Sequence, residues 1–164
     1  SLILQLSNQS HKNVTSWINA LRKIKWKLVL IGQLDIALRE QLIECDIDYV
    51  SHVNLTHEEI CQQYVNCDIV SFVSLAEGFG MPIIEAQASG RPIITSNLLP
   101  MSEVAGDGAC LVDPLDVSQI REGILKIITD SSYRDKLVER GLRNVVHYSP
   151  ATISEQYLAI YELL

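Results

Sequence analysis

Two glutamates flank a glycine-bearing turn near the middle of the chain. Glu77 and Glu85 are separated by the seven residues Gly78-Phe79-Gly80-Met81-Pro82-Ile83-Ile84. A turn of this kind that leads into a helix directs free backbone N–H groups and the positive end of the helix dipole at one point, where an anion binds readily. Two carboxylates would repel a bare phosphate, but they would accept hydrogen bonds from sugar hydroxyls. The combination therefore favours a phosphorylated sugar as the ligand.

The residues on either side of this turn predict the strand and the helix that hold it. The apolar run at 69–73 predicts a buried strand, and residues 82–88 predict a short helix that ends at Gly90. Pro82 suits the first helical turn, because the N–H that proline lacks needs no partner there. Glu85 is then expected in the first helical turn. The residues alone leave a second interpretation open, in which the glycines only permit close packing and the glutamates are exposed.

The composition predicts a globular protein that does not bind nucleic acid. The 164 residues fit one domain of ordinary size, residues 1–164, and 48% of them are hydrophobic. The formal net charge of -7 argues against a nucleic-acid partner, which would require a basic face. No apolar run in the sequence approaches the ~20 residues that span a membrane, and we expect no signal peptide before the first strand.

The cysteines and histidines show no spacing that is typical of a metal site. No two cysteines form a Cys-x-x-Cys pair, and the histidines at positions 11, 52, 57 and 147 form no ligand pattern with them. We therefore expect a reduced, cytoplasmic protein whose site contains no metal and no cofactor.

Short apolar segments alternate with helical segments along most of the chain. The expected strands lie at residues 2–6, 27–32, 49–53, 69–73, 92–95 and 109–112. This alternation predicts a doubly wound, Rossmann-like α/β fold, with a parallel sheet of about six strands and helices on both faces. Ligands of such folds bind outside the carboxyl ends of the strands. Segments 7–12, 52–53 and 77–85 and Asn97 all lie at or just beyond the carboxyl ends of expected strands, so we expect them at one edge.

Sequence signals also mark several helices. Thr56 and Glu59 fit a capping box, and the helix after the first strand is expected to begin near Lys12-Asn13. Residues after Pro114 predict helices only, and the last of these, from about Ala151, has an apolar stripe. The first of these helices is expected to face the core through Val117, Ile120, Ile124 and Ile128.

The block from Asp68 to Pro114 resembles the donor-binding half of the retaining GT-B glycosyltransferases, the large family called group 1 or family 4. Glu77 and Glu85 resemble the Glu-x7-Glu motif of that family. The segments 90–96, 102–107 and 111–114 resemble the motifs that follow it, in the same order and with similar spacing. The similarity covers nearly the whole chain and implies one half of a GT-B fold.

The resemblance implies a donor site for a nucleoside-diphosphate sugar. Glu85 would accept hydrogen bonds from the ribose hydroxyls of the donor. The backbone amides of Phe79, Gly80 and Met81 would hold the diphosphate, with help from the ammonium group of Lys12. These groups would stabilise the negative charge of the leaving diphosphate without a metal.

Glu77 is the candidate catalytic residue that the resemblance implies. It would bind a sugar hydroxyl near the anomeric carbon, and its role would be orientation and electrostatic support. The implied reaction transfers a glycosyl group from the nucleotide sugar to an acceptor with retention of configuration. The expected partners are the nucleotide sugar and an N-terminal acceptor-binding domain of the same enzyme. This chain would then be one domain of a two-domain enzyme, and any membrane association would come through the other part.

The turn before Lys12 departs from the family pattern. Many members have Gly-Arg several residues before the lysine, and the arginine also grips the diphosphate, whereas this chain has Ser7-Asn8. The neutral side-chain amide of Asn8 replaces the permanently charged, planar guanidinium group of arginine. We therefore expect weaker binding of the diphosphate, unless another group supplies the missing contacts.

Two alternative functions remain open at this point. One is a nucleotide-sugar epimerase or phosphorylase of the same architecture. The other is a non-catalytic nucleotide-binding module, which the missing arginine favours. The presence of both Glu77 and Glu85 argues against such a module, because a degraded site need not keep the two carboxylates.

Overall fold

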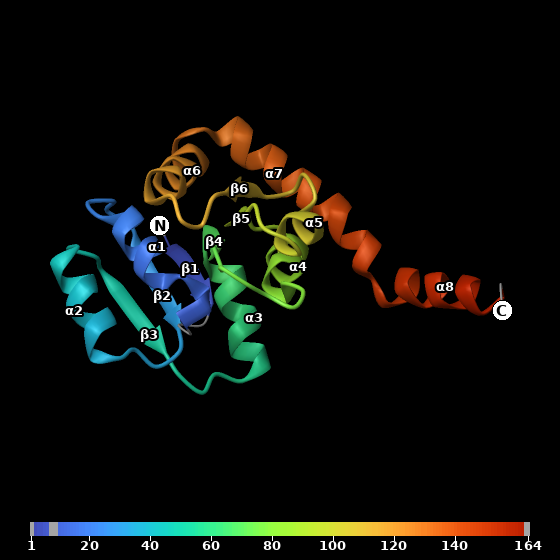
Figure 1. Ribbon diagram of the computed structural model, residues 1–164, viewed down its shortest axis with the longest axis horizontal. Helices are drawn as coiled ribbons and strands as arrows, with labels where there is room; N and C mark the ends of the chain where they lie inside the picture. Colours follow the sequence, from blue (N-terminus) through green and yellow to red (C-terminus); the bar gives the residue numbers. More distant parts are fainter. Residues whose placement is uncertain (1, 7–9, 163–164) are drawn as a thin grey trace.

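The sheet contains six strands in the order β3-β2-β1-β4-β5-β6 (Figure 1). The structure, a computed structural model, describes residues 2–6 and 10–162. The strands are β1 (Leu2–Leu6), β2 (Lys27–Ile31), β3 (Tyr49–His52), β4 (Ile69–Phe72), β5 (Ile93–Ser96) and β6 (Cys110–Val112). All neighbouring pairs are parallel. The predicted parallel α/β sheet is confirmed.

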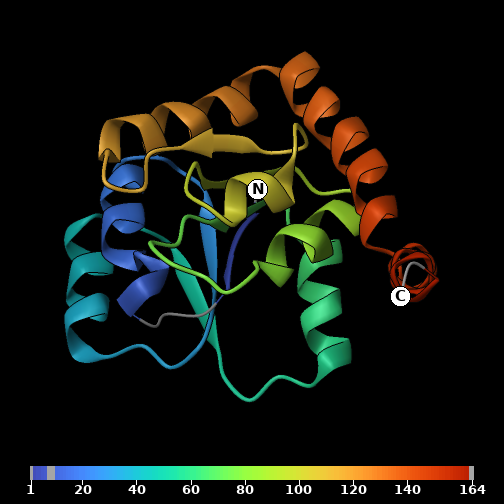
Figure 2. The same ribbon diagram turned by 45° about the vertical axis from the view of Figure 1, so that its right-hand side comes forward.

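Helices cover both faces of the sheet, as the doubly wound fold requires (Figure 2). They are α1 (Val14–Leu21), α2 (Ile36–Glu44), α3 (His57–Asn66), α4 (Met81–Ala88), α5 (Met101–Ala105), α6 (Val117–Thr129), α7 (Ser131–Asn144) and α8 (Pro150–Tyr161), with the 3-10 turns η1 (Ser10–Lys12) and η2 (Val145–Tyr148). Helices α1, α2 and α6 pack on one face of the sheet, and α3, α4 and α5 pack on the other.

Two hydrophobic cores lie on the two sides of the sheet, because successive strand residues point to opposite faces. Ile3 of β1 joins Trp17 of α1 in one core, and the next residue, Leu4, joins the other. The second core also contains Phe72 of β4 and Ile83 of α4. Helix α4 is therefore anchored to the strand that immediately precedes it.

The expected helix signals are confirmed, with small shifts. The Oγ1 atom of Thr56 accepts a hydrogen bond from the Glu59 backbone N–H at 3.3 Å, and the Glu59 carboxylate accepts one from the Thr56 N–H at 2.8 Å. In α6 the third buried isoleucine is Ile127, whereas Ile128, which we expected in the core, is only partly buried. Ile128 and Val117 both pack against the same core while they stay partly exposed.

A network of two side-chain amides, the buried Gln87 and the partly buried Asn144, fixes α4 against α5 and α7. The Nε2 atom of Gln87 donates to the carbonyl oxygen of Ala105 at 2.9 Å. The Nδ2 atom of Asn144 donates to Gln87 Oε1 at 2.9 Å and to the carbonyl oxygen of Val104 at 2.8 Å. Because Gln87 is only 1% exposed, these bonds satisfy polar atoms that would otherwise be costly to bury.

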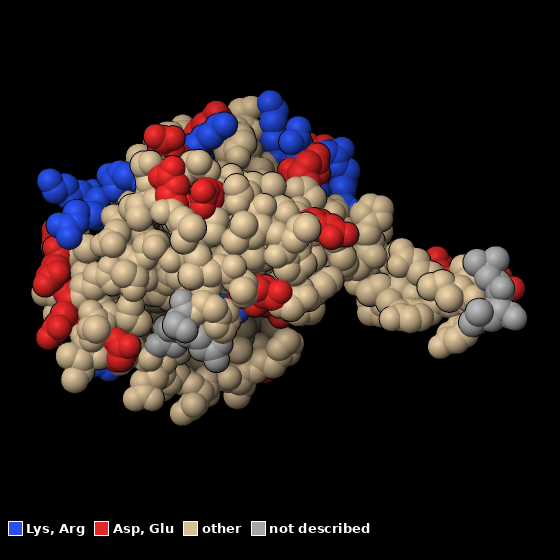
Figure 3. Space-filling view, in the orientation of Figure 1, with Lys and Arg blue, Asp and Glu red and all other residues tan. Residues whose placement is uncertain are grey.

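Helix α8 extends away from the rest of the molecule (Figures 1 and 3). None of its residues is buried, and it carries no lysine or arginine. Its expected apolar stripe is therefore exposed, and Tyr157, Ile160 and Tyr161 are more than half exposed. None of the helices within residues 2–6 and 10–162 is both long and apolar enough to cross a lipid bilayer.

The close approach of α7 to the segment before β6 generates the first prediction. A Cβ atom added at Gly108 would lie 2.6 Å from the backbone of Gly141. We expect Gly108→Ala to lower the free energy of unfolding by about 1–3 kcal/mol, because the backbones must separate. Urea denaturation would measure this loss. Gly78→Ala is the matched control, because a Cβ atom there meets nothing within 4 Å. Equal stability of the two variants would contradict the prediction.

Candidate functional site

An ion pair joins the segments that follow the two central strands. Lys12, at the end of η1 after β1, donates from Nζ to Glu77 Oε1 at 2.6 Å. Each of the two side chains is 12% exposed. The Lys12 ammonium also lies 4.6 Å from the centre of the Phe72 ring, within the range of a cation–π contact. A backbone bond from Leu75 N–H to the His11 carbonyl oxygen, at 2.8 Å, ties the same two segments together.

The segment between β4 and α4, which we call the site loop (residues 73–80), ends on a left-handed glycine. Gly80 has φ 106° and is the N-cap of α4. Ile83 N–H bonds to the Gly80 carbonyl oxygen at 2.9 Å. Within the described part of the chain, the backbone N–H groups of Phe79, Gly80 and Met81 form no backbone hydrogen bond. Free N–H groups at a helix N-terminus are suited to an anion.

Glu85 lies at the start of the second turn of α4, one residue further along the helix than predicted, because α4 begins at Met81 and not at Pro82. Glu85 is the fifth residue of the helix. Its carboxylate Oε2 accepts a hydrogen bond from the Tyr64 hydroxyl of α3 at 2.6 Å. The structure thus gives the two glutamates different partners: Glu77 pairs with Lys12, and Glu85 pairs with Tyr64.

Tyr64 is not among the predicted site residues. Its spacing of four positions from Ile60 on a helix indicates only an inward-facing side chain, and Tyr64 is 2% exposed. Burial, and then the Glu85 carboxylate, raise the pKa of the Tyr64 phenol above its ordinary value. The phenol therefore stays protonated and donates to Glu85. No signal in the sequence could pair the two residues, because they lie on different helices.

Buried hydroxyls of β5 support the base of the site loop. Thr95 Oγ1 donates to the Phe72 carbonyl oxygen at 2.8 Å, and Ser96 Oγ donates to the Ser74 carbonyl oxygen. Both hydroxyls are fully buried. They hold the end of β4 and the start of the loop on the neighbouring strand, so the loop leaves the sheet in a fixed direction.

His52, Val53 and Asn97, which are also predicted at the carboxyl edge of the sheet, lie at or just beyond the ends of strands. His52 ends β3 and is partly buried, Val53 after it is exposed, and Asn97 follows β5. The Asn97 N–H bonds to the Val112 carbonyl oxygen at 2.8 Å. Their part in ligand binding stays a prediction. Ser7 and Asn8, where the sequence departs from the family pattern, lie outside the described residues.

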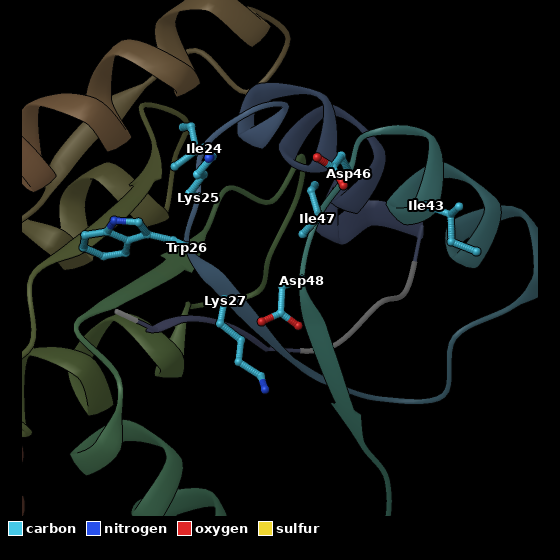
Figure 4. Close-up of a pocket in the computed structure, with 8 residues that line it drawn as sticks. All are labelled: Ile24, Lys25, Trp26, Lys27, Ile43, Asp46, Ile47 and Asp48. Atoms are coloured by element: carbon cyan, nitrogen blue, oxygen red, sulfur yellow. The ribbon is translucent and has the colours of Figure 1, made fainter.

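Within residues 2–6 and 10–162, no group of three or more His, Cys, Asp and Glu side chains is placed to hold a metal ion. A separate hollow of about 680 Å³ lies at the amino ends of β2 and β3 (Figure 4). Lys27 and Asp48, which border it, extend from the starts of these neighbouring strands. This hollow is at the opposite edge of the sheet from Lys12 and Glu77, and its charges are mixed, so it does not share the site.

Several known proteins are similar to this chain in sequence. Residues 2–144 match the family described as glycosyl transferases group 1. O-antigen chain mannosyltransferase B of Escherichia coli is 34% identical over 118 residues, which are 72% of this chain and 30% of that protein. The MMP alpha-(1->4)-mannosyltransferase of Mycolicibacterium hassiacum is 33% identical over 130 residues, 75% of this chain and 32% of that protein. This chain thus spans about a third of the length of these curated relatives.

Solved structures share the fold. Sucrose-phosphate synthase from Thermosynechococcus elongatus matches with a TM-score of 0.85 and 21% identity, over 98% of this chain and 45% of that one. HepE of Anabaena, solved with UDP and glucose, matches with a TM-score of 0.82 and 20% identity, over 99% of this chain and 48% of that one. The C-terminal domain of LpcC, a glycosyl transferase group 1 family protein from Francisella tularensis, matches with a TM-score of 0.76 and 25% identity, over 88% of this chain and 84% of that one. The fold is one half of a GT-B architecture.

The geometry of the Lys12–Glu77 pair generates the second prediction. The pair is nearly buried and short, so its two members should be coupled by about 1–3 kcal/mol in the free energy of unfolding. A double-mutant cycle of Lys12→Met and Glu77→Gln, followed by urea denaturation, measures this coupling.

The control cycle uses Arg143→Met and Glu139→Gln on α7. That pair is 3.6 Å apart, and its side chains are 67% and 68% exposed, so its coupling should be only about 0.2–0.5 kcal/mol and should vanish in high salt. A Lys12–Glu77 coupling as small and as salt-sensitive as this control would contradict the prediction.

Proposed function

This chain belongs to the glycosyl transferases of group 1, and we propose from that membership that it binds the nucleoside-diphosphate sugar of a glycosyl transfer reaction. The observation that carries the proposal is the convergence of a lysine, a glutamate and free helix amides on one edge of the sheet. Lys12 and Glu77 meet at 2.6 Å beside the N-terminus of α4. These groups match the two halves of such a donor, a diphosphate and a sugar with hydroxyls.

The amides of Phe79, Gly80 and Met81, together with Lys12, are proposed to hold the diphosphate. A lysine ammonium has three N–H donors, and the bond to Glu77 uses one of them. Two donors therefore remain for phosphate oxygens, and the ion pair does not have to break when the donor binds. As the glycosidic bond breaks, negative charge grows on the diphosphate, and fixed amides with a lysine stabilise that charge.

Glu77 is the proposed catalytic residue on the sugar side of the site. Its second carboxylate oxygen is free of Lys12 and is proposed to accept a hydrogen bond from a sugar hydroxyl near the anomeric carbon. Such a contact would orient the sugar for transfer with retention of configuration. Glu85, held by Tyr64 on the neighbouring helix, is proposed to accept hydrogen bonds from the ribose hydroxyls.

The relatives guide the choice of donors to test. Two of the similar curated proteins are named as mannosyltransferases, and HepE was solved with UDP and glucose. Nucleotide sugars with mannose and with glucose are therefore the first candidates. Because the match covers only 30% and 32% of these two curated relatives, we propose that the acceptor binds to another part of the enzyme.

The proposed division of labour between the glutamates predicts different losses in two variants. Glu85→Ala should weaken binding of a nucleoside diphosphate by roughly ten- to a hundred-fold, with or without an attached sugar, because a charged acceptor worth about 1.5–3 kcal/mol is lost. Glu77→Ala should weaken binding of the nucleotide sugar more than binding of the nucleoside diphosphate. Isothermal titration calorimetry with UDP, GDP and their glucose and mannose derivatives measures both.

The control variant is Glu122→Ala, which removes an exposed glutamate from α6 on the far side of the sheet. It should bind every ligand as the unmodified protein does. Equal losses for both ligand types in Glu85→Ala and Glu77→Ala would refute the division of labour. A protein that binds none of these ligands would refute the proposed function itself.

A further inference from the structure

We propose that Tyr64 is a positioning residue that fixes the Glu85 carboxylate and thereby lets the site discriminate a ribonucleotide from a 2′-deoxyribonucleotide. The inference rests on the proposed function, in which Glu85 binds ribose hydroxyls. Tyr64 would not touch the ligand, because its hydroxyl is already committed to Glu85.

The contact between these residues has the geometry of a strong, charge-assisted hydrogen bond. The Tyr64 hydroxyl donates to Glu85 Oε2 at 2.6 Å, between α3 and α4. Within the described residues, the Glu85 carboxylate has no other side-chain partner. The two residues also help to line a small hollow of about 200 Å³, together with His57 and Ile60.

The surroundings of Tyr64 would suit a phenylalanine if packing were its only role. Its ring belongs to the same core as Phe72 and Ala86, and only 2% of the residue is exposed. A buried hydroxyl lowers stability unless it is hydrogen-bonded, and the apolar core offers no gain from it. Among the described residues, the hydroxyl bonds only to Glu85, so this bond explains why a tyrosine stands here.

The hydrogen bond from Tyr64 to Glu85 Oε2 determines which ligand groups the rest of the Glu85 carboxylate can bind. A carboxylate offers about four acceptor positions, and the Tyr64 hydroxyl occupies one on Oε2. The plane of the carboxylate is then fixed, and Oε1 with the remaining position on Oε2 can meet two neighbouring hydroxyls. Because Tyr64 stays protonated, it donates its one hydroxyl proton to Glu85, and the carboxylate presents only acceptor positions to the ligand. A 2′-deoxyribose has only one hydroxyl to offer and loses the paired contact.

The test compares ribonucleotides with their deoxy forms. Calorimetry would give the Kd of UDP and of 2′-deoxy-UDP, and of GDP and 2′-deoxy-GDP, for the unmodified protein and for Tyr64→Phe. We expect the unmodified protein to prefer the ribose form, and we expect Tyr64→Phe to reduce this preference about three- to ten-fold, while the Kd of the deoxy form changes little. Tyr133→Phe, a partly buried tyrosine on the opposite face of the sheet, should leave the preference unchanged.

A second comparison asks whether Tyr64 acts through Glu85. In a protein that already carries Glu85→Ala, Tyr64→Phe should have no further effect on the preference. An unchanged preference in Tyr64→Phe alone, or equal weakening of ribose and deoxy forms, would show a structural role and overturn the proposal. So would a loss of folding in Tyr64→Phe, detected as a collapsed melting temperature. If the unmodified protein bound no nucleoside diphosphate, the proposed function would fail first and this inference with it.

Discussion

The architecture depends on one topological constraint, the reversal of strand order between β1 and β4. From β1 the chain moves to β2 through α1, which packs on one face of the sheet, whereas from β4 it moves to β5 through α4, which packs on the other. The two connections diverge at the carboxyl edge, and ligands of open α/β sheets bind in the crevice formed there. Lys12 follows β1 and Glu77 follows β4, so they lie on the two sides of this switch point, and their 2.6 Å contact joins the two segments. A cation and a carboxylate are thus held together by the order of the strands.

A ligand can bind at this edge only if α4 and the site loop keep their positions. Contacts in the protein interior hold both segments. Two contacts hold helix α4. Gln87 of α4 bonds to Asn144 of α7, and Glu85 of α4 bonds to Tyr64 of α3. The start of the site loop is held by hydroxyls of β5. With its body anchored in this way, α4 can leave the amides at its first turn unpaired. A preorganised set of donors needs no rearrangement when charge develops on a ligand, and this is the condition for electrostatic stabilisation of a leaving group.

The strands and the capping box were predictable because their signals are local: apolar runs for β1 to β6 and the Thr56–Glu59 spacing for α3. The contacts that define the site are not local. The Lys12–Glu77 pair joins residues 65 positions apart, and the Tyr64–Glu85 bond depends on how α3 is rotated against α4. The helical turn of Glu85 was predicted wrongly because the left-handed Gly80 starts α4 at Met81, before Pro82. The identities of the site residues followed from a family resemblance, whereas their partners required the three-dimensional structure.

The central claim, that a nucleoside diphosphate binds at the N-terminus of α4, can be tested most directly by nuclear magnetic resonance. In a titration of the ¹⁵N-labelled protein with UDP or GDP, the largest saturable shifts are expected at the amides of Phe79, Gly80 and Met81. The indole N–H of Trp26, beside the hollow at the opposite edge of the sheet, should not shift and serves as an internal reference. Shifts confined to Trp26 and its neighbours, or no saturable shift at the three amides with either nucleotide, would contradict the account.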